Sequence, residues 1–265
     1  MTKRGPLTWL GESLAGLSFV PVTLIFYWQI AFTGQILASY DLFTYFYPLR
    51  AYAAQALREG HLPLWNPYLF MGAPFLANIQ TAVFYPFTWL GLFFEPPQAT
   101  SISILAHIFL AANFSYAFGR VALGLGRWGA YLGALVFAFG GFFTQQVGHI
   151  NQLNAMAWLP FVFLSFHLAF RGRILWLGLG GMGLALQLLA GHPQVVYLTG
   201  AGLGLYGFLE VLGAASERGK TALSWWRRLA RRVTGLLPLG MWALLVLGVM
   251  AGLGGGLAGA QLLPT

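Results

Sequence analysis

The chain has 265 residues, of which 58% are hydrophobic and only 8% are charged. Soluble domains carry roughly a quarter charged residues, so this composition excludes an ordinary soluble protein and predicts an integral membrane protein. The net charge is +8 and no cysteine is present, which excludes disulfides, zinc–thiolate sites and thiol catalysis. Because the basic residues lie in short gaps between apolar runs, where membrane topology requires them, the charge does not indicate nucleic-acid binding.

Apolar runs of spanning length recur along the whole sequence. A helix that crosses the hydrocarbon layer needs about 20 predominantly apolar residues. Seven runs approach this length: 12–33, 101–119, 129–147, 153–170, 174–191, 194–213 and 236–260. They predict an all-α polytopic membrane protein with about seven transmembrane helices, organised as a single membrane domain over residues 1–265. Glycine-rich runs within 178–183 and 252–256 predict closely packed helices.

Residues 82–94 form a further apolar stretch, which is shorter and is interrupted by Pro86. A helix of this length spans about 20 Å, which is less than the ~30 Å thickness of the hydrocarbon layer. We therefore expect an interfacial or re-entrant segment that does not cross the membrane.

The basic residues indicate an orientation. With residues 82–94 on one side and the N-terminus inside, twelve of the 14 Lys and Arg residues lie in inner segments, and only Arg50 and Arg58 lie outside. This satisfies the positive-inside rule and makes residues 35–100 a long outer loop and residues 214–235 an inner basic loop. The reversed topology, in which residues 82–94 cross, gives the same count. Segment length, and the usual dominance of charges before the first helix, favour the first topology.

The first part of the outer loop has the pattern of an amphipathic helix. Pro48 suits a first helical turn and Gly60 suits a helix end. Between them, apolar residues recur at helical spacing: Leu49, Tyr52, Ala53, Ala56 and Leu57. We expect this helix to lie on the membrane surface. Residues 60–80 are broken by prolines and glycines, and we expect an irregular loop with interfacial aromatic residues.

Residues 39–48 read SYDLFTYFYP and contain the only aspartate of the chain, Asp41. One interpretation is a helix cap or a surface carboxylate that pairs with Arg50 or Arg58. The other is a catalytic base at the membrane surface. The residue type alone does not distinguish them.

Other polar residues fall on the same predicted side of the membrane, at the ends of apolar runs. They are Gln145, Gln146, His149, Asn151, Gln152, Asn154, His192, Gln194 and Gln261. We expect them to converge near Asp41. Together, Asp41, His149 and His192 could hold an ion, so a divalent cation is a possible cofactor. The sequence contains no acid pair beside Asp41 and no HExxH motif, so we assign no metal ligands and no certain cofactor.

The stretches 41–48, 60–87, 149–161, 191–194 and 261–265 together resemble the bacterial YfhO family of polytopic membrane proteins. That family is similar to the GT-C superfamily, whose members transfer a sugar from a polyprenyl-phosphate carrier on the outer face of the membrane. The resemblance implies a GT-C-like fold in the bacterial cell (inner) membrane, with an extracytoplasmic active face. It also implies that this chain is the N-terminal fragment of a longer protein.

By position, the acidic loop residue of the family falls on Asp41, and its polar stretch falls on Asn66, Asn78 and Gln80. Many GT-C enzymes carry paired acids, so the solitary Asp41 leaves metal dependence open. One carboxylate is chemically sufficient, because a sugar phosphate leaves as a stable anion and only the incoming hydroxyl needs a base.

The resulting hypothesis is that Asp41 deprotonates a hydroxyl of a cell-envelope acceptor, which attacks the anomeric carbon while polyprenyl phosphate leaves. The donor is a membrane lipid, and no nucleic acid is involved. The candidate phosphate-binding and sugar-binding residues are Arg50, Arg58, Asn66, Asn78, Gln80, His149, Asn151, Gln152, His192 and Gln194.

Two other functions fit the same sequence. A transporter or lipid flippase usually keeps ionisable residues near the middle of the membrane, where this chain has mainly His107. A non-catalytic membrane scaffold would use the outer loop to bind a partner, and Asp41 would then be only structural.

Overall fold

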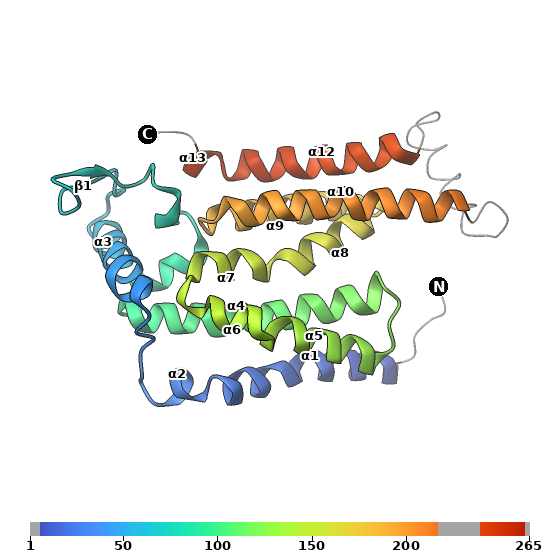
Figure 1. The fold of residues 1–265 in the computed structure, drawn as a ribbon, viewed down its shortest axis with the longest axis horizontal. Coiled ribbons are helices and arrows are strands. Elements are labelled where there is room, and N and C mark those ends of the chain that lie inside the picture. The colour runs from blue at the N-terminus through green and yellow to red at the C-terminus, as the bar shows by residue number, and fades with distance from the viewer. Residues whose placement is uncertain (1–5, 217–238, 263–265) are drawn as a thin grey trace.

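The computed structural model describes residues 6–216 and 239–262, so most of the predicted inner basic loop, residues 214–235, lies outside the described residues. The described part of the chain is mostly helical, at 77% of its residues. The long helices run side by side along the longest axis of the molecule (Figure 1). We call the end that carries α3, β1 and α13 the loop end.

The first half of the described chain contains one long loop between two long helices. Its elements are α1 (Pro6–Phe26), α2 (Trp28–Phe32), a π-helical segment (Leu42–Phe46), α3 (Tyr47–Arg58), β1 (Trp65–Asn66), β2 (Ala73–Pro74), two 3-10 segments (Ile79–Thr81 and Pro86–Leu92) and α4 (Pro96–Val121). The two strands pair antiparallel over two residues each. They are a small turn within the loop, and the fold is all-α as predicted.

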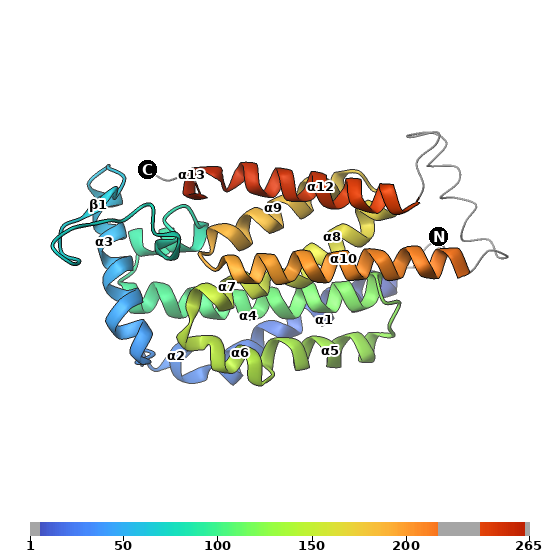
Figure 2. The ribbon, with the colours of Figure 1, turned by 45° about the horizontal axis from the view of Figure 1, so that its top comes forward.

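The second half of the described chain is a series of antiparallel helices. Its elements are α5 (Arg127–Phe139), α6 (Gly141–Gln145), a 3-10 turn (Gln146–Gly148), α7 (Ile150–Ala157), α8 (Leu159–Phe170), α9 (Leu175–Leu189), α10 (Pro193–Ser216), α12 (Leu239–Leu257) and α13 (Gly259–Leu262). Seen from a second direction, the long helices still lie in a bundle with the loop at one end (Figure 2).

Four helical stretches are long and apolar enough to cross a membrane: Pro96–Val121, Arg127–Gly148, Ile150–Phe170 and Pro193–Leu212. Each overlaps one of the predicted spanning runs. The other three predicted runs overlap shorter apolar helices: Gly11–Phe26, Leu175–Leu189 and Met241–Leu257. Long apolar helices of this kind are compatible with a membrane protein, whereas the count of seven spans and the GT-C topology stay predictions.

Local signals explain where these helices begin and end. The α4 helix starts at two prolines, which have no backbone N–H to leave unpaired in a first turn. The α9 helix is followed by Gly191, which has a φ of +86° that glycine adopts at little cost, and Pro193 then starts α10. Close packing between α9 and α12 depends on glycine, because a Cβ atom on Gly181 would lie 2.6 Å from the Cβ atom of Leu253.

The apolar stretch at residues 82–94 stays at the loop end. It contains the 3-10 segment Pro86–Leu92, while α1 ends and α4 begins at that same end of the bundle (Figure 1). This placement, and the lack of a helix of spanning length in this stretch, favour the predicted topology over the reversed one, and an interfacial position for the stretch stays a prediction. Which side of the membrane the loop end faces stays a prediction.

The predicted amphipathic helix is present as α3, but its surroundings differ from the prediction. Its apolar stripe is buried by the chain itself, since Leu49 and Ala53 form a cluster with Phe75, Leu76 and Val83. The loop turns back at β1 and β2 and covers the stripe. Contact with protein removes this apolar surface from water, as contact with lipid would. The stripe therefore packs on protein and not on lipid, while the position of the helix at the membrane surface stays a prediction.

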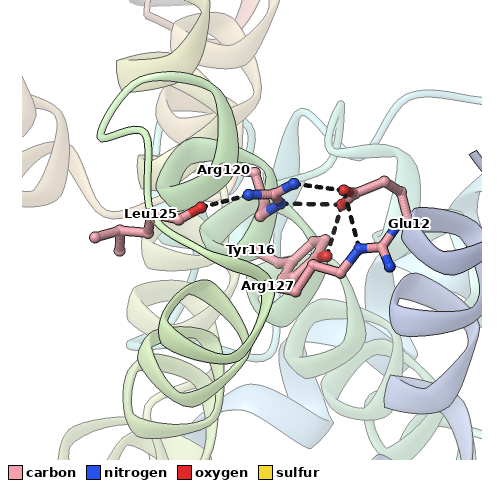
Figure 3. Close-up of polar contacts among 5 residues, drawn as sticks. All are labelled: Glu12, Tyr116, Arg120, Leu125 and Arg127. Atoms are coloured by element: carbon pink, nitrogen blue, oxygen red, sulfur yellow. Dashed lines mark hydrogen bonds and ion pairs between the residues drawn. The ribbon is translucent and has the colours of Figure 1, made fainter. Parts of the chain in front are cut away.

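An ion cluster joins three helices at the end opposite to the loop end. Figure 3 shows Glu12 of α1 between Arg120 of α4 and Arg127 of α5. Arg120 donates to both carboxylate oxygens, from Nη2 at 2.6 Å and from Nε at 3.1 Å. Tyr116 donates at 2.6 Å, and Arg127 Nε lies 3.4 Å from Oε1. The sequence pattern explains these arginines by membrane topology and does not mark Glu12 as their partner.

Candidate functional site

A polar pocket of about 320 Å³ opens at the loop end. Its walls come from four places in the sequence: the start of the long loop, the 3-10 segment near residue 80, the turn before α7 with the first residues of that helix, and the turn before α10. The lining residues are Asp41, Tyr45, Phe46, Gln80, His149, Asn151, Gln152 and His192. The structure thus brings together six of the predicted site residues in a volume typical of small-molecule sites.

Asp41 and His149 form an ion-pair contact in this pocket. Asp41 Oδ2 lies 3.1 Å from His149 Nδ1, and the two side chains are 45% and 54% exposed. Asp41 stands at the start of the π-helical segment, but its side chain makes no capping hydrogen bond. Its partner is His149 rather than Arg50 or Arg58. The helix-cap interpretation and the arginine-pair interpretation are both replaced by a carboxylate–imidazole pair.

The turn before α7 places His149 beside the loop. His149 follows the 3-10 turn Gln146–Gly148 and directly precedes α7. A Cβ atom on Gly148 would lie 2.9 Å from the hydroxyl oxygen of Ser39. The absence of a side chain at Gly148 therefore lets residues 39–41 approach the turn, which carries the carboxylate to the imidazole.

His192 forms the opposite wall and is held by a similar close approach. A Cβ atom on Gly191 would lie 2.6 Å from the carbonyl oxygen of Ile79 and 2.7 Å from Nδ2 of Asn151. Burial lowers the pKa of His192, and the nearby positive charge of a protonated His149 lowers it further, while a hydrogen bond with Gln194 opposes the shift. His192 is therefore neutral at neutral pH, and Gln194 lies beside it.

Arg50 lies behind the pocket wall and ties three segments together. Its Nη1 donates to the carbonyl oxygen of Thr81 at 2.9 Å and also to the hydroxyl of Thr88. Its Nη2 donates to Oδ1 of Asn151 at 2.8 Å, and Asn151 in turn donates to the carbonyl oxygen of Gln80 at 2.7 Å. Burial lowers the pKa of Arg50 to about 10, so the group is still cationic at neutral pH. These contacts fix the loop to α7 and give Arg50 a positioning role instead of the predicted phosphate contact.

Two of the other predicted residues lie outside the pocket. Arg58 donates to the carbonyl oxygens of Gly91 at 2.7 Å and Leu92 at 3.3 Å. Asn66 accepts from the backbone N–H of Tyr68 at 2.9 Å, which stabilises the turn after β1. Both residues hold the loop in shape.

Asn78 supports the pocket from behind. Its Oδ1 accepts from the backbone N–H of Gln80 at 3.1 Å, and its Nδ2 donates to the hydroxyl of Tyr45 at 2.9 Å. Gln80 and Tyr45 both line the pocket. Sequence reasoning missed Tyr45 and Phe46, although their positions four and five residues after Asp41 place them one helical turn along the same face.

A second polar group is buried between α4, the loop and α7. The hydroxyl of Tyr85 pairs with Nε2 of His107 and accepts from Nε1 of Trp158 at 2.9 Å. The other ring nitrogen of His107 contacts the carbonyl oxygen of Ser103 at 2.6 Å. His107 is fully buried and both of its nitrogens have partners. It connects the loop to the helix bundle.

Within residues 6–216 and 239–262, no group of three or more His, Cys, Asp or Glu side chains is arranged to hold a metal ion. The three-residue ion site considered for Asp41, His149 and His192 is therefore not formed.

No protein-family model, no curated protein and no solved structure matches this chain. Its function has to be inferred from the chemistry of the pocket.

Proposed function

We propose that this chain is a membrane glycosyltransferase of the YfhO type, with a GT-C-like arrangement of seven spans. It moves a sugar from a polyprenyl-phosphate carrier to a cell-envelope acceptor on the extracytoplasmic face of the cell membrane. The observation that carries the proposal is the placement of the carboxylate of Asp41, 3.1 Å from His149, in a polar pocket at one end of an apolar helical bundle.

The chemistry of sugar transfer suits this pocket. Asp41 supplies the basic function, either directly or through His149, for a hydroxyl that attacks the anomeric carbon. The leaving polyprenyl phosphate is a stable anion and needs no acid. Its oxygens can accept hydrogen bonds from the side-chain amides of Gln80 and Gln152 in the pocket lining, because Arg50 and Arg58 donate to protein oxygens instead.

The remaining walls suit a sugar. Gln80 and Gln152 offer amide donors and acceptors, while Tyr45 and Phe46 supply aromatic surface. A pocket with a few polar groups among aromatic side chains orients a small polar ligand. The position of the pocket at the end of apolar helices allows an isoprenoid tail to stay in lipid while the headgroup enters.

The test is a sugar-transfer assay in proteoliposomes that contain polyprenyl phosphate linked to radiolabelled hexoses, with solubilised cell envelope as the acceptor source. Asp41→Asn should reduce transfer at least about 100-fold, because general-base catalysis is typically worth that much or more. The matched control is Glu59→Gln. Glu59 is also an exposed carboxylate at the loop end and lies 3.8 Å from a histidine, His61, but neither residue lines the pocket. An unchanged rate in Asp41→Asn would remove the proposed base.

The flippase alternative is distinguished in the same vesicles. The flippase alternative depends on His107. Because His107 contacts Tyr85 and Ser103, it has a structural role, and this alternative has little support. Movement of the lipid-linked sugar across the bilayer without any transfer would favour a flippase, and the absence of both would favour a scaffold.

A further inference from the structure

We propose that His149 is the group that takes the proton of the acceptor hydroxyl, and that Asp41 acts as a positioning residue for its imidazole. This inference rests on the proposed sugar transfer and assigns the proton-accepting atom within it. It changes the role of Asp41 from a direct base to an orienting carboxylate.

The geometry of the pair carries the inference. Oδ2 of Asp41 lies 3.1 Å from Nδ1 of His149, and its negative charge favours the neutral tautomer that carries the proton on this nearer nitrogen. Nε2 is then the unprotonated nitrogen, and its lone pair is the atom that can accept a proton. The imidazole side chain is 54% exposed and lines the pocket, so a substrate hydroxyl can reach it.

The other histidines in the described part of the chain lack this combination. His61 lies 3.8 Å from Glu59, outside the pocket. His167 contacts Glu210 at 3.5 Å, but its side chain is only 2% exposed. His107 has partners on both nitrogens. His149 is the histidine that joins a carboxylate partner to an accessible ring edge in the pocket.

The groups that face His149 are consistent with this role. Asp41, before the π-helical segment, presents its carboxylate to Nδ1 of His149 at 3.1 Å. Tyr45 faces the pocket from the π-helical segment, and His192 faces it from the turn before α10. The guanidinium of Arg50, behind the pocket wall, donates to Asn151 and to the loop. A protonated His149 therefore has one carboxylate beside it and no neighbouring arginine in the lining of the pocket to oppose it.

The step balances as written. The acceptor oxygen forms a bond to the anomeric carbon, and the bond between that carbon and the phosphate oxygen breaks. The bonding electron pair leaves with polyprenyl phosphate, and the acceptor proton moves to Nε2 of His149. The imidazolium then releases the proton to solvent, which reaches the half-exposed side chain.

The test measures transfer as a function of pH in the same proteoliposomes, with the same lipid-linked hexoses. The unsubstituted protein should lose activity on acidification at about pH 6–7, where imidazoles titrate, rather than at about pH 4, where free aspartates titrate. His149→Ala should reduce transfer by about 10²- to 10⁴-fold, and added imidazole should restore part of it. His61→Ala is the matched control and should leave the rate unchanged.

Asp41→Asn distinguishes an orienting role of the carboxylate from a purely structural one. Loss of the carboxylate should lower kcat with little change in the KM for the lipid-linked donor, because the imidazole loses the group that orients it. Added imidazole should not restore this variant.

Three results would overturn the inference. If His149→Ala transfers sugar at nearly the normal rate, or if the acid limb stays at a carboxylate pH, Asp41 acts directly while the proposed function stands. If imidazole fails to restore His149→Ala although the variant is folded, the imidazole is not the proton acceptor. If the unsubstituted protein transfers no sugar from any of the donors, the proposed function fails and this inference fails with it.

Discussion

The two ends of the helical bundle each carry a carboxylate paired with a base, and they use it differently. At the opposite end, Glu12 receives hydrogen bonds from two arginines and a tyrosine, and its side chain is 19% exposed. At the loop end, Asp41 contacts the imidazole of His149 and is 45% exposed beside an open pocket. A carboxylate whose oxygens already accept several hydrogen bonds holds helices together. A half-exposed carboxylate can still act on a ligand, or it can orient a base that acts on the ligand.

The first test of this comparison neutralises each carboxylate in a separate variant. Glu12→Gln removes the charge between Arg120 and Arg127, and because this cluster is only partly buried the loss should cost about 3 kcal/mol, the lower end of the range for buried ion pairs. We expect a decrease of this size in the free energy of unfolding, measured by denaturation in detergent. Sugar transfer by the folded fraction should stay normal.

Asp41→Asn is the matched variant for that measurement. An exposed ion pair contributes about 0–1 kcal/mol, so its unfolding free energy should barely change while transfer is lost. Equal destabilisation by the two substitutions would contradict the difference between the two ends.

Arg50 sharpens the comparison, because it is a fully engaged charge at the loop end. Arg50→Met removes the donors to Thr81, Thr88 and Asn151 and leaves acceptors without partners, which should cost about 2–3 kcal/mol of unfolding free energy. Transfer should fall as well, since Asn151 and Gln80 lose their fixed positions.

The control for Arg50 is Arg58→Met. Arg58 is exposed and bonds only to backbone oxygens of the loop outside the pocket. If both substitutions had the same small effect, Arg50 would not be the residue that fixes the loop to α7.

The smallest effect concerns the backbone of the pocket wall. Gly191→Ala combines a φ of +86° with a Cβ atom 2.6 Å from the carbonyl oxygen of Ile79, and should cost about 2 kcal/mol. Gly60→Ala has a φ of +81° and open space around the new methyl group, so it should cost only about 1 kcal/mol. The difference in unfolding free energy between the two variants measures the cost of the steric clash at Gly191. Equal costs would show that the turn can move to make room for the methyl group.

Much of the fold follows from local sequence. The apolar runs overlap the long helices. A helix that is buried in the bundle or contacts lipid needs a continuous apolar surface, and the composition of each run shows this directly. The amphipathic spacing predicted α3 correctly. It did not predict that protein covers the apolar stripe, because a stripe that packs on protein has the same spacing as one that contacts lipid. The predicted partners of the arginines failed for a related reason: Arg50 and Arg58 bind backbone and amide oxygens that no charge pattern marks.

By itself, the sequence determined that the chain is an apolar helical protein with one long loop, and that its solitary aspartate and several amides and imidazoles lie toward the same ends of the helices. Only the tertiary structure decided that Asp41 meets His149, that Arg50 is engaged behind the wall, and that Glu12 joins three helices. The physical reason is that helix formation depends on nearest neighbours along the chain, whereas an ion pair depends on how close two distant turns approach. At the pocket, that approach is permitted by glycines at positions 148 and 191, which leave room for the loop to come down onto the helix ends.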